Sequence, residues 1–235
     1  MRGVQADPGP HARVWPLRVR SRTIWRPEPG VATTTLLLRH GQTAMSAQKR
    51  YSGRSDVPLN ETGLWQAAAA AKRLADAGIG AIVSSPLRRA VQTAEEVAAA
   101  AGVDVILDEG FRETDFGAWE GLTFTEVRER WPAELTTWLA DPAVPPPGGE
   151  SFTAVSERVT AALHRVVQDR DHHRILIVSH VTPIKTLVAS ALLAPPAALY
   201  RMHLDLAALS EVDWYADGPA VLRSFNDTAH LAGRG

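Results

Sequence analysis

A short apolar run leads directly into three residues that could bind and attack a phosphate group. Residues 36–38 are all leucine, and Arg39, His40 and Gly41 follow them. An apolar run that stops at a turn signal is typical of a buried parallel strand. Arginine offers a planar fork of donors that suits phosphate, and a neutral histidine can act as a nucleophile. The pattern predicts an anion-binding, nucleophilic site at the end of this strand, and Gly41 is expected to let the backbone approach a ligand.

A second histidine follows another apolar run in the same way. Residues 175–178 lead through a serine into His180, and a helix is expected to open at Thr182. The free N–H groups and the positive end of that helix would favour an anion beside His180. Because ligands bind beyond the carboxyl ends of parallel strands, we expect His40 and His180 to share one site.

A third junction between strand and helix supplies arginines. Residues 84–90 contain Ser85, which is expected to cap a helix, and then Arg88 and Arg89 in the first turn of that helix. Either arginine could reach an anion at the shared site, and residue type alone does not choose between them. A solvated first turn is the alternative, and for Arg88 it is the preferred interpretation.

A loop at residues 108–121 supplies carboxyl groups among aromatic side chains. A carboxyl group in such surroundings can serve as a general acid that gives a proton to a leaving group. The spacing alone gives no reason to prefer one of the three candidates, which are Glu113, Asp115 and Glu120.

The remaining apolar pattern alternates between strand and helix. Strands are predicted at residues 33–39, 79–84, 103–107, 174–179, 206–215 and 220–226, and helices at residues 63–77, 86–101, 123–131, 133–139, 151–168 and 182–193. Residues 41–60 are predicted to form a polar loop. This alternation is typical of one α/β domain with a mainly parallel sheet.

Composition limits the classes of protein to which this chain can belong. It has 235 residues, 45% of them hydrophobic, a net charge of −1 and no cysteine. A charge so close to zero argues against binding of nucleic acid or membrane by the core, and no apolar run approaches the roughly 20 residues that span a bilayer. The lack of cysteine fits a reducing compartment, so a cytoplasmic location is expected.

Residues 1–32 are predicted to be a tail, separate from a domain at residues 33–235. The first 30 residues carry six arginines against two acidic residues, and five prolines would interrupt a helix there. A disordered linker or the remnant of a longer chain is the favoured interpretation. A nucleic-acid contact through this tail is left open, as is a homodimer.

Four motifs, in this order, resemble the histidine phosphatase superfamily, in its phosphoglycerate-mutase-like branch 1. They are Arg39-His40-Gly41-x-Thr43, Ser85-x-Leu87-x-Arg89-Ala90-x-x-Thr93-Ala94, Glu113-x-x-Phe116-Gly117-x-Trp119-Glu120-Gly121 and Val178-Ser179-His180. Four ordered motifs make a specific match, whereas any one alone would be weak. The resemblance implies a three-layer α/β/α sandwich with a mainly parallel sheet.

Residues 50–53, 179–185 and 226–231 resemble one branch of the family most closely. It is the α-ribazole-phosphatase-like acid phosphatase domain that actinobacterial proteins carry behind an RNase H domain. Residues 1–32 are too few to form an RNase H domain. The chain is therefore interpreted as the phosphatase module alone, or as the later part of a longer gene product.

The resemblance assigns a role to each candidate residue. It implies that His40 attacks phosphorus to form phosphohistidine, and that Glu113 protonates the leaving oxygen and later activates water. Arg39, Arg89 and His180 would stabilise the phosphoryl oxygens. It is the resemblance that selects Arg89 and Glu113 from the candidates above. The residues expected to contact substrate are Thr43, Ser46, Ser52, Gly53 and Thr182.

Two positions depart from the family pattern. Ser46 stands where the family often has asparagine, and Val181 and Thr182 stand where it usually has two glycines. A serine hydroxyl could still bind phosphate or water, and bulk at Val181 would narrow the pocket. Substrates are therefore not transferred from relatives.

The predicted function is metal-independent hydrolysis of small phosphorylated metabolites, with no cofactor. A phosphoglycerate mutase is the first alternative, less favoured because such mutases carry insertions for which this chain has little room. A phospholigand-binding module without turnover is the second. A metal site at His172 and His173, beside Asp169 and Asp171, is rejected because adjacent side chains point apart.

Overall fold

The computed structural model describes residues 32–168, 173–216 and 218–233. The predicted tail therefore lies outside the described residues, except for Ala32. The rejected metal cluster also falls mostly outside them, since His173 is its only described member.

Six strands form one sheet in the order β3-β2-β4-β1-β5-β6. The four strands from β3 to β1 run parallel, whereas β5 pairs antiparallel with both β1 and β6. The sheet is thus mainly parallel, which confirms the predicted fold class. The strands are β1 (Ala32–Arg39), β2 (Ala81–Ser84), β3 (Val105–Leu107), β4 (Arg174–Ser179), β5 (Leu209–Tyr215) and β6 (Ala220–Asp227).

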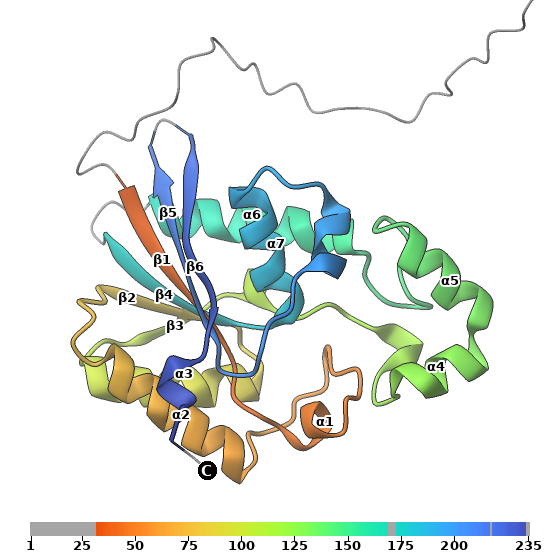
Figure 1. Ribbon diagram of the computed structural model, residues 1–235, viewed down its shortest axis with the longest axis horizontal. Coiled ribbons are helices and arrows are strands. Elements are labelled where there is room, and N and C mark those ends of the chain that lie inside the picture. Colours follow the sequence, from red (N-terminus) through yellow and green to blue (C-terminus); the bar gives the residue numbers. More distant parts are fainter. Residues whose placement is uncertain (1–31, 169–172, 217, 234–235) are drawn as a thin grey trace, which may run out of the picture.

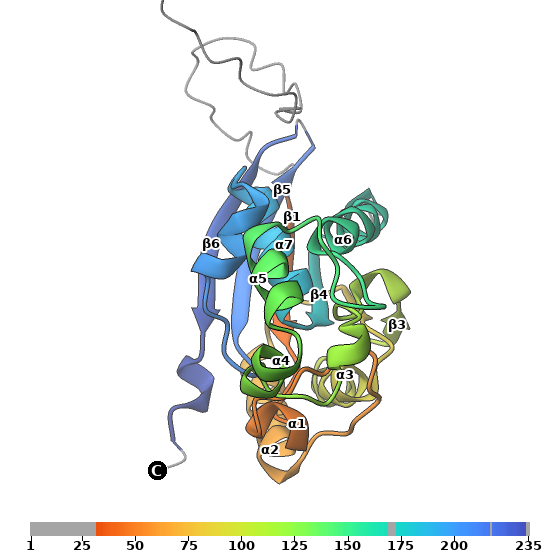
Figure 2. The same ribbon diagram turned by 90° about the vertical axis from the view of Figure 1, so that its right-hand side faces the viewer.

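Helices cover both faces of this sheet, which confirms the three-layer arrangement (Figure 1, Figure 2). Helices α2 (Glu61–Leu74) and α3 (Arg88–Ala101) pack on one face, and α6 (Phe152–Gln168) and α7 (Val181–Ala191) pack on the other. None of the helices in the described part of the chain is long and apolar enough to cross a bilayer.

The two central strands explain why both faces are covered. In β1, Leu37 faces the core beneath α6 and α7, while Leu38 faces the core beneath α2 and α3. The paired residues of β4, Ile177 and Val178, divide between the same two cores. A strand buried on both faces reads as a continuous apolar run, as the sequence shows.

Two further helices, α4 (Phe124–Arg130) and α5 (Pro132–Ala140), lie beyond the end of the sheet at which β1 and β4 finish (Figure 1). They enclose a third, separate apolar cluster rather than covering a sheet face. Four short 3₁₀ helices lie among the connections described, at Glu109–Phe111, Gly117–Trp119, Pro196–Arg201 and Ala229–Leu231.

The predicted polar loop at residues 41–60 contains a short helix, α1 (Ala44–Ala47). Thr43 and Ser46 build it, because the hydroxyl of Thr43 accepts the N–H of Ser46 while the hydroxyl of Ser46 accepts the N–H of Thr43. Such a reciprocal cap satisfies two N–H groups that a helix start leaves unpaired. The loop prediction was wrong at this point.

Candidate active site

His40 follows β1, buried to 5% exposure, and one of its ring nitrogens is fixed by the backbone. The Nδ1 atom lies 2.7 Å from the carbonyl oxygen of Gly41. Because a carbonyl oxygen can only accept, Nδ1 carries the proton and Nε2 keeps its lone pair. Burial, followed by the charges of Arg89 and Arg39, holds the pKa of His40 well below 6.5. The ring is therefore a neutral base with one nitrogen available.

Gly41 allows the end of β1 to lie close to α2. A Cβ atom built at Gly41 would lie 2.5 Å from the carbonyl oxygen of Gly63, in the first turn of α2. The absence of a side chain lets the end of β1 pack against this helix. Gly41 therefore has a packing role, and the expectation that it lets the backbone approach a ligand stays a prediction.

Arg39 and Arg89 reach the site with guanidinium groups held by backbone carbonyls. Arg39 donates to the carbonyl of Leu204 at 2.6 Å, and Arg89, only 1% exposed, donates to carbonyls of the loop before α2. Neither forms an ion pair with another described residue, and the Nε of each is buried without a partner among them. Burial lowers the pKa of Arg39 to about 10, so it stays charged at neutral pH.

Three carbonyls of one loop fix Arg89. They belong to Ser52, Gly53 and Ser55, at 2.9, 3.0 and 2.7 Å. Gly53 must be glycine, because a Cβ atom there would lie 2.0 Å from the carbonyl oxygen of Thr114. Arg88 is exposed, whereas Arg89 is buried.

His180 lies beside His40, with ring centroids 5.0 Å apart, and is fully buried. Its Nε2 atom is 2.7 Å from the hydroxyl oxygen of Ser85, and its Nδ1 atom has no partner among the described residues. Burial, and then the charge of Arg89, holds its pKa well below 6.5. Ser85 was expected to cap α3, but Leu87 occupies the N-cap position, so that prediction was wrong.

Glu113 is 7% exposed and is held at the N-terminus of α7. Its carboxylate accepts the N–H groups of Val181 at 3.0 Å, Thr182 at 3.2 Å and Thr114 at 2.8 Å. The anion that this helix start binds is therefore a side chain of the protein, rather than the expected free anion. The helix also begins at Val181, one residue before the predicted start.

The two rejected carboxylates have other partners. Asp115 forms an ion pair with Arg54 at 2.7 Å. Glu120 accepts the N–H groups of Gly53 and Arg54 and the hydroxyl of Ser55. Both hold the loop that holds Arg89, so they support the site from outside it.

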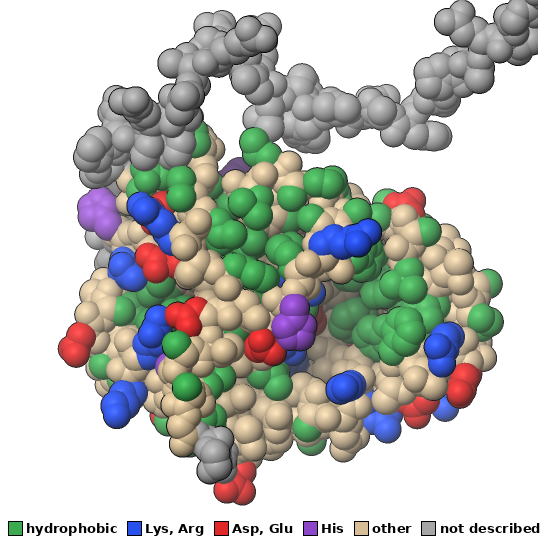
Figure 3. Space-filling model, viewed as in Figure 1, with side chains coloured by type: hydrophobic (Ala, Val, Ile, Leu, Met, Phe, Trp, Pro, Cys, Tyr) green, Lys and Arg blue, Asp and Glu red, His purple; other side chains and the backbone are tan. Residues whose placement is uncertain are grey.

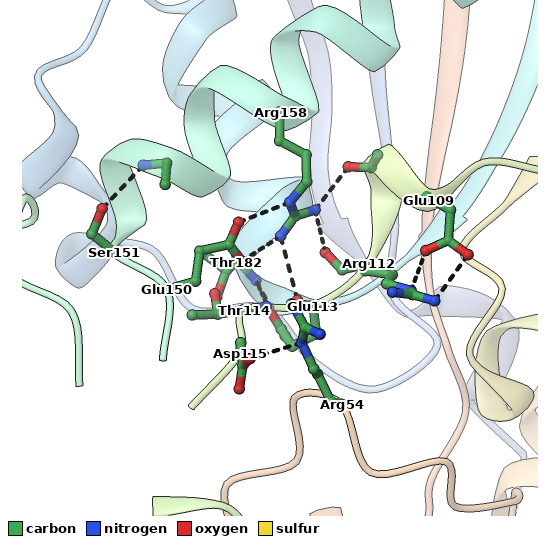
Figure 4. A network of polar contacts seen from close by, with 12 residues as sticks. Arg54, Glu109, Arg112, Glu113, Thr114, Asp115, Glu150, Ser151, Arg158 and Thr182 are labelled. Atoms are coloured by element: carbon green, nitrogen blue, oxygen red, sulfur yellow. Dashed lines mark hydrogen bonds and ion pairs between the residues drawn. The ribbon is translucent and has the colours of Figure 1, made fainter. Parts of the chain in front are cut away.

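Arg158, on α6, is a residue that the sequence analysis missed. It forms an ion pair with Glu150 at 2.7 Å and also donates to the carbonyls of Gly110, Arg112 and Glu113 at 2.9, 2.9 and 3.4 Å (Figure 4). One guanidinium group thus fixes the backbone that delivers the Glu113 side chain. No local pattern marks this role, since the carbonyls that Arg158 binds lie 45 to 48 residues away in the chain.

A cavity of about 570 Å³ opens over these groups. Of the predicted substrate contacts, Thr43, Ser46, Ser52 and Thr182 line it, whereas Gly53 is not among its lining residues. The opposite wall is apolar, and hydrophobic side chains border the hollow on the side of α4 and α5 (Figure 3). The apolar lining residues are Tyr51, Phe116, Phe124, Trp138, Leu139, Phe152, Val181, Leu199 and Tyr200.

Within the described ranges, no three His, Asp or Glu side chains gather in a way that could hold a metal ion. The cations of the site are instead protein side chains. Arg39 and Arg89 could surround a phosphoryl group within reach of His40, while Glu113 stands at its side. Such a site suits a class of protein in which a histidine takes up the phosphoryl group of a phosphomonoester.

Comparison with known proteins agrees with this class. The chain belongs to branch 1 of the histidine phosphatase superfamily, with a match that spans residues 35–228. This confirms the resemblance predicted from the four motifs, and with it the prediction of an enzyme of the histidine phosphatase class.

Curated relatives and solved structures include both phosphatases and mutases. Bifunctional protein Rv2228c of Mycobacterium tuberculosis is 51% identical over 208 residues, which cover 88% of this chain and 57% of that protein. Probable phosphoglycerate mutase GpmB of Cronobacter sakazakii is 38% identical over 203 residues, which cover 83% of this chain and 93% of that one. The solved structure of mycobacterial glucosyl-3-phosphoglycerate phosphatase Rv2419c has a TM-score of 0.77 at 30% identity, covering 84% of this chain and all of the other.

The chain thus spans just over half the length of the first of these relatives. A solved structure of a putative α-ribazole-5'-P phosphatase from Escherichia coli is also similar, with a TM-score of 0.77 at 28% identity, covering 83% of this chain and 97% of the other. The predicted association of this domain type with RNase H stays a prediction, as does the view that the α-ribazole branch is the most similar one.

Proposed function

We propose that this chain hydrolyses small phosphate monoesters through a phosphohistidine formed on His40. One observation carries the proposal: the bond from Nδ1 of His40 to the Gly41 carbonyl leaves the Nε2 lone pair free beside two arginines. The name of the solved relative, a glucosyl-3-phosphoglycerate phosphatase, supports hydrolysis.

The first step forms the bond from Nε2 of His40 to phosphorus and breaks the bond from phosphorus to the ester oxygen. The departing oxygen takes the electron pair of that bond and a proton from Glu113. In the second step a water molecule gives a proton to the Glu113 carboxylate and attacks phosphorus. The P–N bond breaks, its electron pair returns to Nε2, and inorganic phosphate leaves.

Charge on the transferring group is stabilised by the arginines and by His180. The guanidinium groups of Arg39 and Arg89 offer donors already held in place by carbonyls, so little reorganisation accompanies the reaction. The hydroxyl of Ser85 accepts the N–H of Leu87 at 3.3 Å. We infer that it donates its own proton to Nε2 of His180, which leaves Nδ1–H for a phosphoryl oxygen.

The polar residues of the cavity complete the proposal. Thr43, Ser46, Ser52 and Thr182 line the cavity and are proposed to contact substrate. Gly53 is proposed to act through Arg89, which its carbonyl holds. A homodimer and a cytoplasmic location stay predictions, and the proposed reaction requires neither a metal nor a cofactor.

Phosphoglycerate mutase activity is a second candidate, because a relative at 38% identity bears that name. A mutase returns the phosphoryl group to a sugar acid, whereas a phosphatase gives it to water. Incubation with 3-phosphoglycerate separates the two, since release of inorganic phosphate marks hydrolysis and formation of 2-phosphoglycerate marks mutase activity.

The decisive experiment compares the wild-type protein with His40→Ala. It measures hydrolysis of 4-nitrophenyl phosphate and detects the phosphoenzyme as protein-bound phosphate that acid releases. We expect both turnover and phosphoenzyme to be lost in His40→Ala. His164→Ala, at an exposed position of α6, is the matched control and should keep both. Turnover that persists in His40→Ala would refute the proposed mechanism.

A further inference from the structure

Lys185 lines the cavity but has no part in the mechanism described above. It lies in α7, four and three residues after Val181 and Thr182, and therefore on the same face of that helix. The backbone N–H groups of those two residues hold the carboxylate of Glu113, and the charge of that carboxylate also acts on Lys185. Lys185 thus stands on the side of the cavity where the leaving group departs.

The ammonium group of Lys185 is half-buried and poorly matched by its surroundings. Its one hydrogen bond to a described residue runs to the carbonyl of Leu199, at 3.3 Å. An ammonium group has three donors and no acceptor, so this contact leaves two of them for other partners. The ion pairs among the described residues all involve arginine or histidine, so Lys185 has no carboxylate counter-ion there.

 

The charges around Lys185 leave room for one more negative group. Burial, and then the charge of Arg39, lowers the pKa of Lys185, while the nearby Glu113 acts in the opposite direction. When Glu113 carries the proton that it gives to the leaving group, a phosphoryl dianion faces Arg39 and Arg89, and Lys185 is left as a half-buried cation without an ion pair. The other cations that line the cavity are Lys49, which is exposed, and Arg50, which pairs with Glu126. A negative group on the substrate would neutralise Lys185.

We propose that Lys185 binds a carboxylate on the leaving group of the substrate, close to the ester oxygen. This inference rests on the proposed phosphatase function, because Glu113 defines where the ester oxygen lies. A partly desolvated ammonium forms a strong, charge-assisted hydrogen bond with a carboxylate. The substrate class is therefore the phosphate monoesters of hydroxy acids, and Lys185 is the residue that distinguishes them from neutral esters.

The test uses two alkyl monoesters that differ in one group. In 3-phosphoglycerate a carboxylate stands where glycerol 3-phosphate has a hydroxymethyl group. We expect Lys185→Met to lower kcat/KM for 3-phosphoglycerate, measured by phosphate release, by about 10-fold or more, because a hydrogen bond to a charged group is lost. For glycerol 3-phosphate the change should stay within about 3-fold. Lys185→Arg should restore part of the difference.

Lys49→Met is the matched control, since Lys49 is an exposed lysine at the same cavity. Loss of the exposed charge of Lys49 should change kcat/KM for both substrates by the same factor. An equal loss on both substrates in Lys185→Met, or no loss on either, would overturn the inference.

A binding measurement separates this inference from the proposed function. Calorimetric titration of His40→Ala with the same two esters needs no turnover. If His40→Ala binds 3-phosphoglycerate more tightly than glycerol 3-phosphate, and the double variant His40→Ala/Lys185→Met does not, the inference is supported even if hydrolysis is never seen. Equal binding of the two esters would overturn it even if hydrolysis is confirmed.

Discussion

Replacement of Arg158 by methionine should impair the acid step more than the rest of the reaction. The methionine side chain keeps much of the apolar stem of Arg158 but cannot donate to the carbonyls of Gly110, Arg112 and Glu113. The backbone that presents the Glu113 carboxyl group would then lose its fixed position. The fold should survive, because α6 also buries an apolar face against the sheet.

The magnitude follows from the contacts that are lost. The side chains of Arg158 and Glu150 are 24% and 22% exposed, so their ion pair lies between the surface and buried cases. We expect the free energy of unfolding to fall by about 2–3 kcal/mol. Displacement of a catalytic group by about 1 Å can cost about 100-fold in rate, so we expect a loss of about 10- to 100-fold where the acid is needed.

The assay compares two leaving groups. Glycerol 3-phosphate expels a poor leaving group that needs a proton, whereas 4-nitrophenyl phosphate expels a stable anion that does not. In Arg158→Met, kcat/KM, which includes the steps only up to departure of the alcohol, should fall about 10- to 100-fold for the alkyl ester and change much less for the aryl ester. Glu150→Gln is the matched control, since it removes the ion pair and leaves the carbonyl contacts to Arg158 in place.

Two results would refute this reasoning. The first is an equal loss of kcat/KM on both esters in Arg158→Met, which would mean that Arg158 does not act through the acid role of Glu113. The second is a selective loss on the alkyl ester in Glu150→Gln as large as that in Arg158→Met, which would trace the effect to the ion pair rather than to the carbonyl contacts.

Two further predictions concern the buried histidines. Ser85→Ala should lower kcat/KM about 10-fold by removing the partner of His180, while Ser84→Ala, an equally buried hydroxyl next to it, should change kcat/KM far less. Because the folded state holds the pKa of His40 and His180 well below 6.5, the unfolded chain binds more protons below that pH. The free energy of unfolding, measured by urea denaturation, should therefore fall as pH drops below 6.5, by about 1.4 kcal/mol per pH unit for each histidine, and His180→Gln should reduce the slope.

The sequence predicted the strands and the ends at which the site lies, because β1 and β4 are buried on both faces and so read as unbroken apolar runs. It also predicted both histidines, since each directly follows such a run. The four-residue helix α1 was missed because it is too short to show a helical period.

Contacts between distant segments could not be predicted. Ser85 and His180 are 95 residues apart, and only the pairing of β2 with β4 brings them together. Arg158 has the pattern of an ordinary amphipathic helix residue, and its reach toward Glu113 depends on where α6 crosses the sheet. The capture of the Glu113 carboxylate by α7 likewise depends on tertiary packing, which explains why a free anion site was expected there.

The carbonyl contacts of Arg39 and Arg89 have a consequence for the reaction product. Since backbone carbonyls hold both guanidinium groups and no ion pair with a described carboxylate neutralises them, inorganic phosphate is attracted to the same place as the substrate. Product that accumulates would compete with substrate and would also favour the folded state over the unfolded one. At about 100 times its dissociation constant, phosphate would add about 2.7 kcal/mol to the free energy of unfolding. Turnover and resistance to unfolding should therefore respond to phosphate concentration in opposite directions.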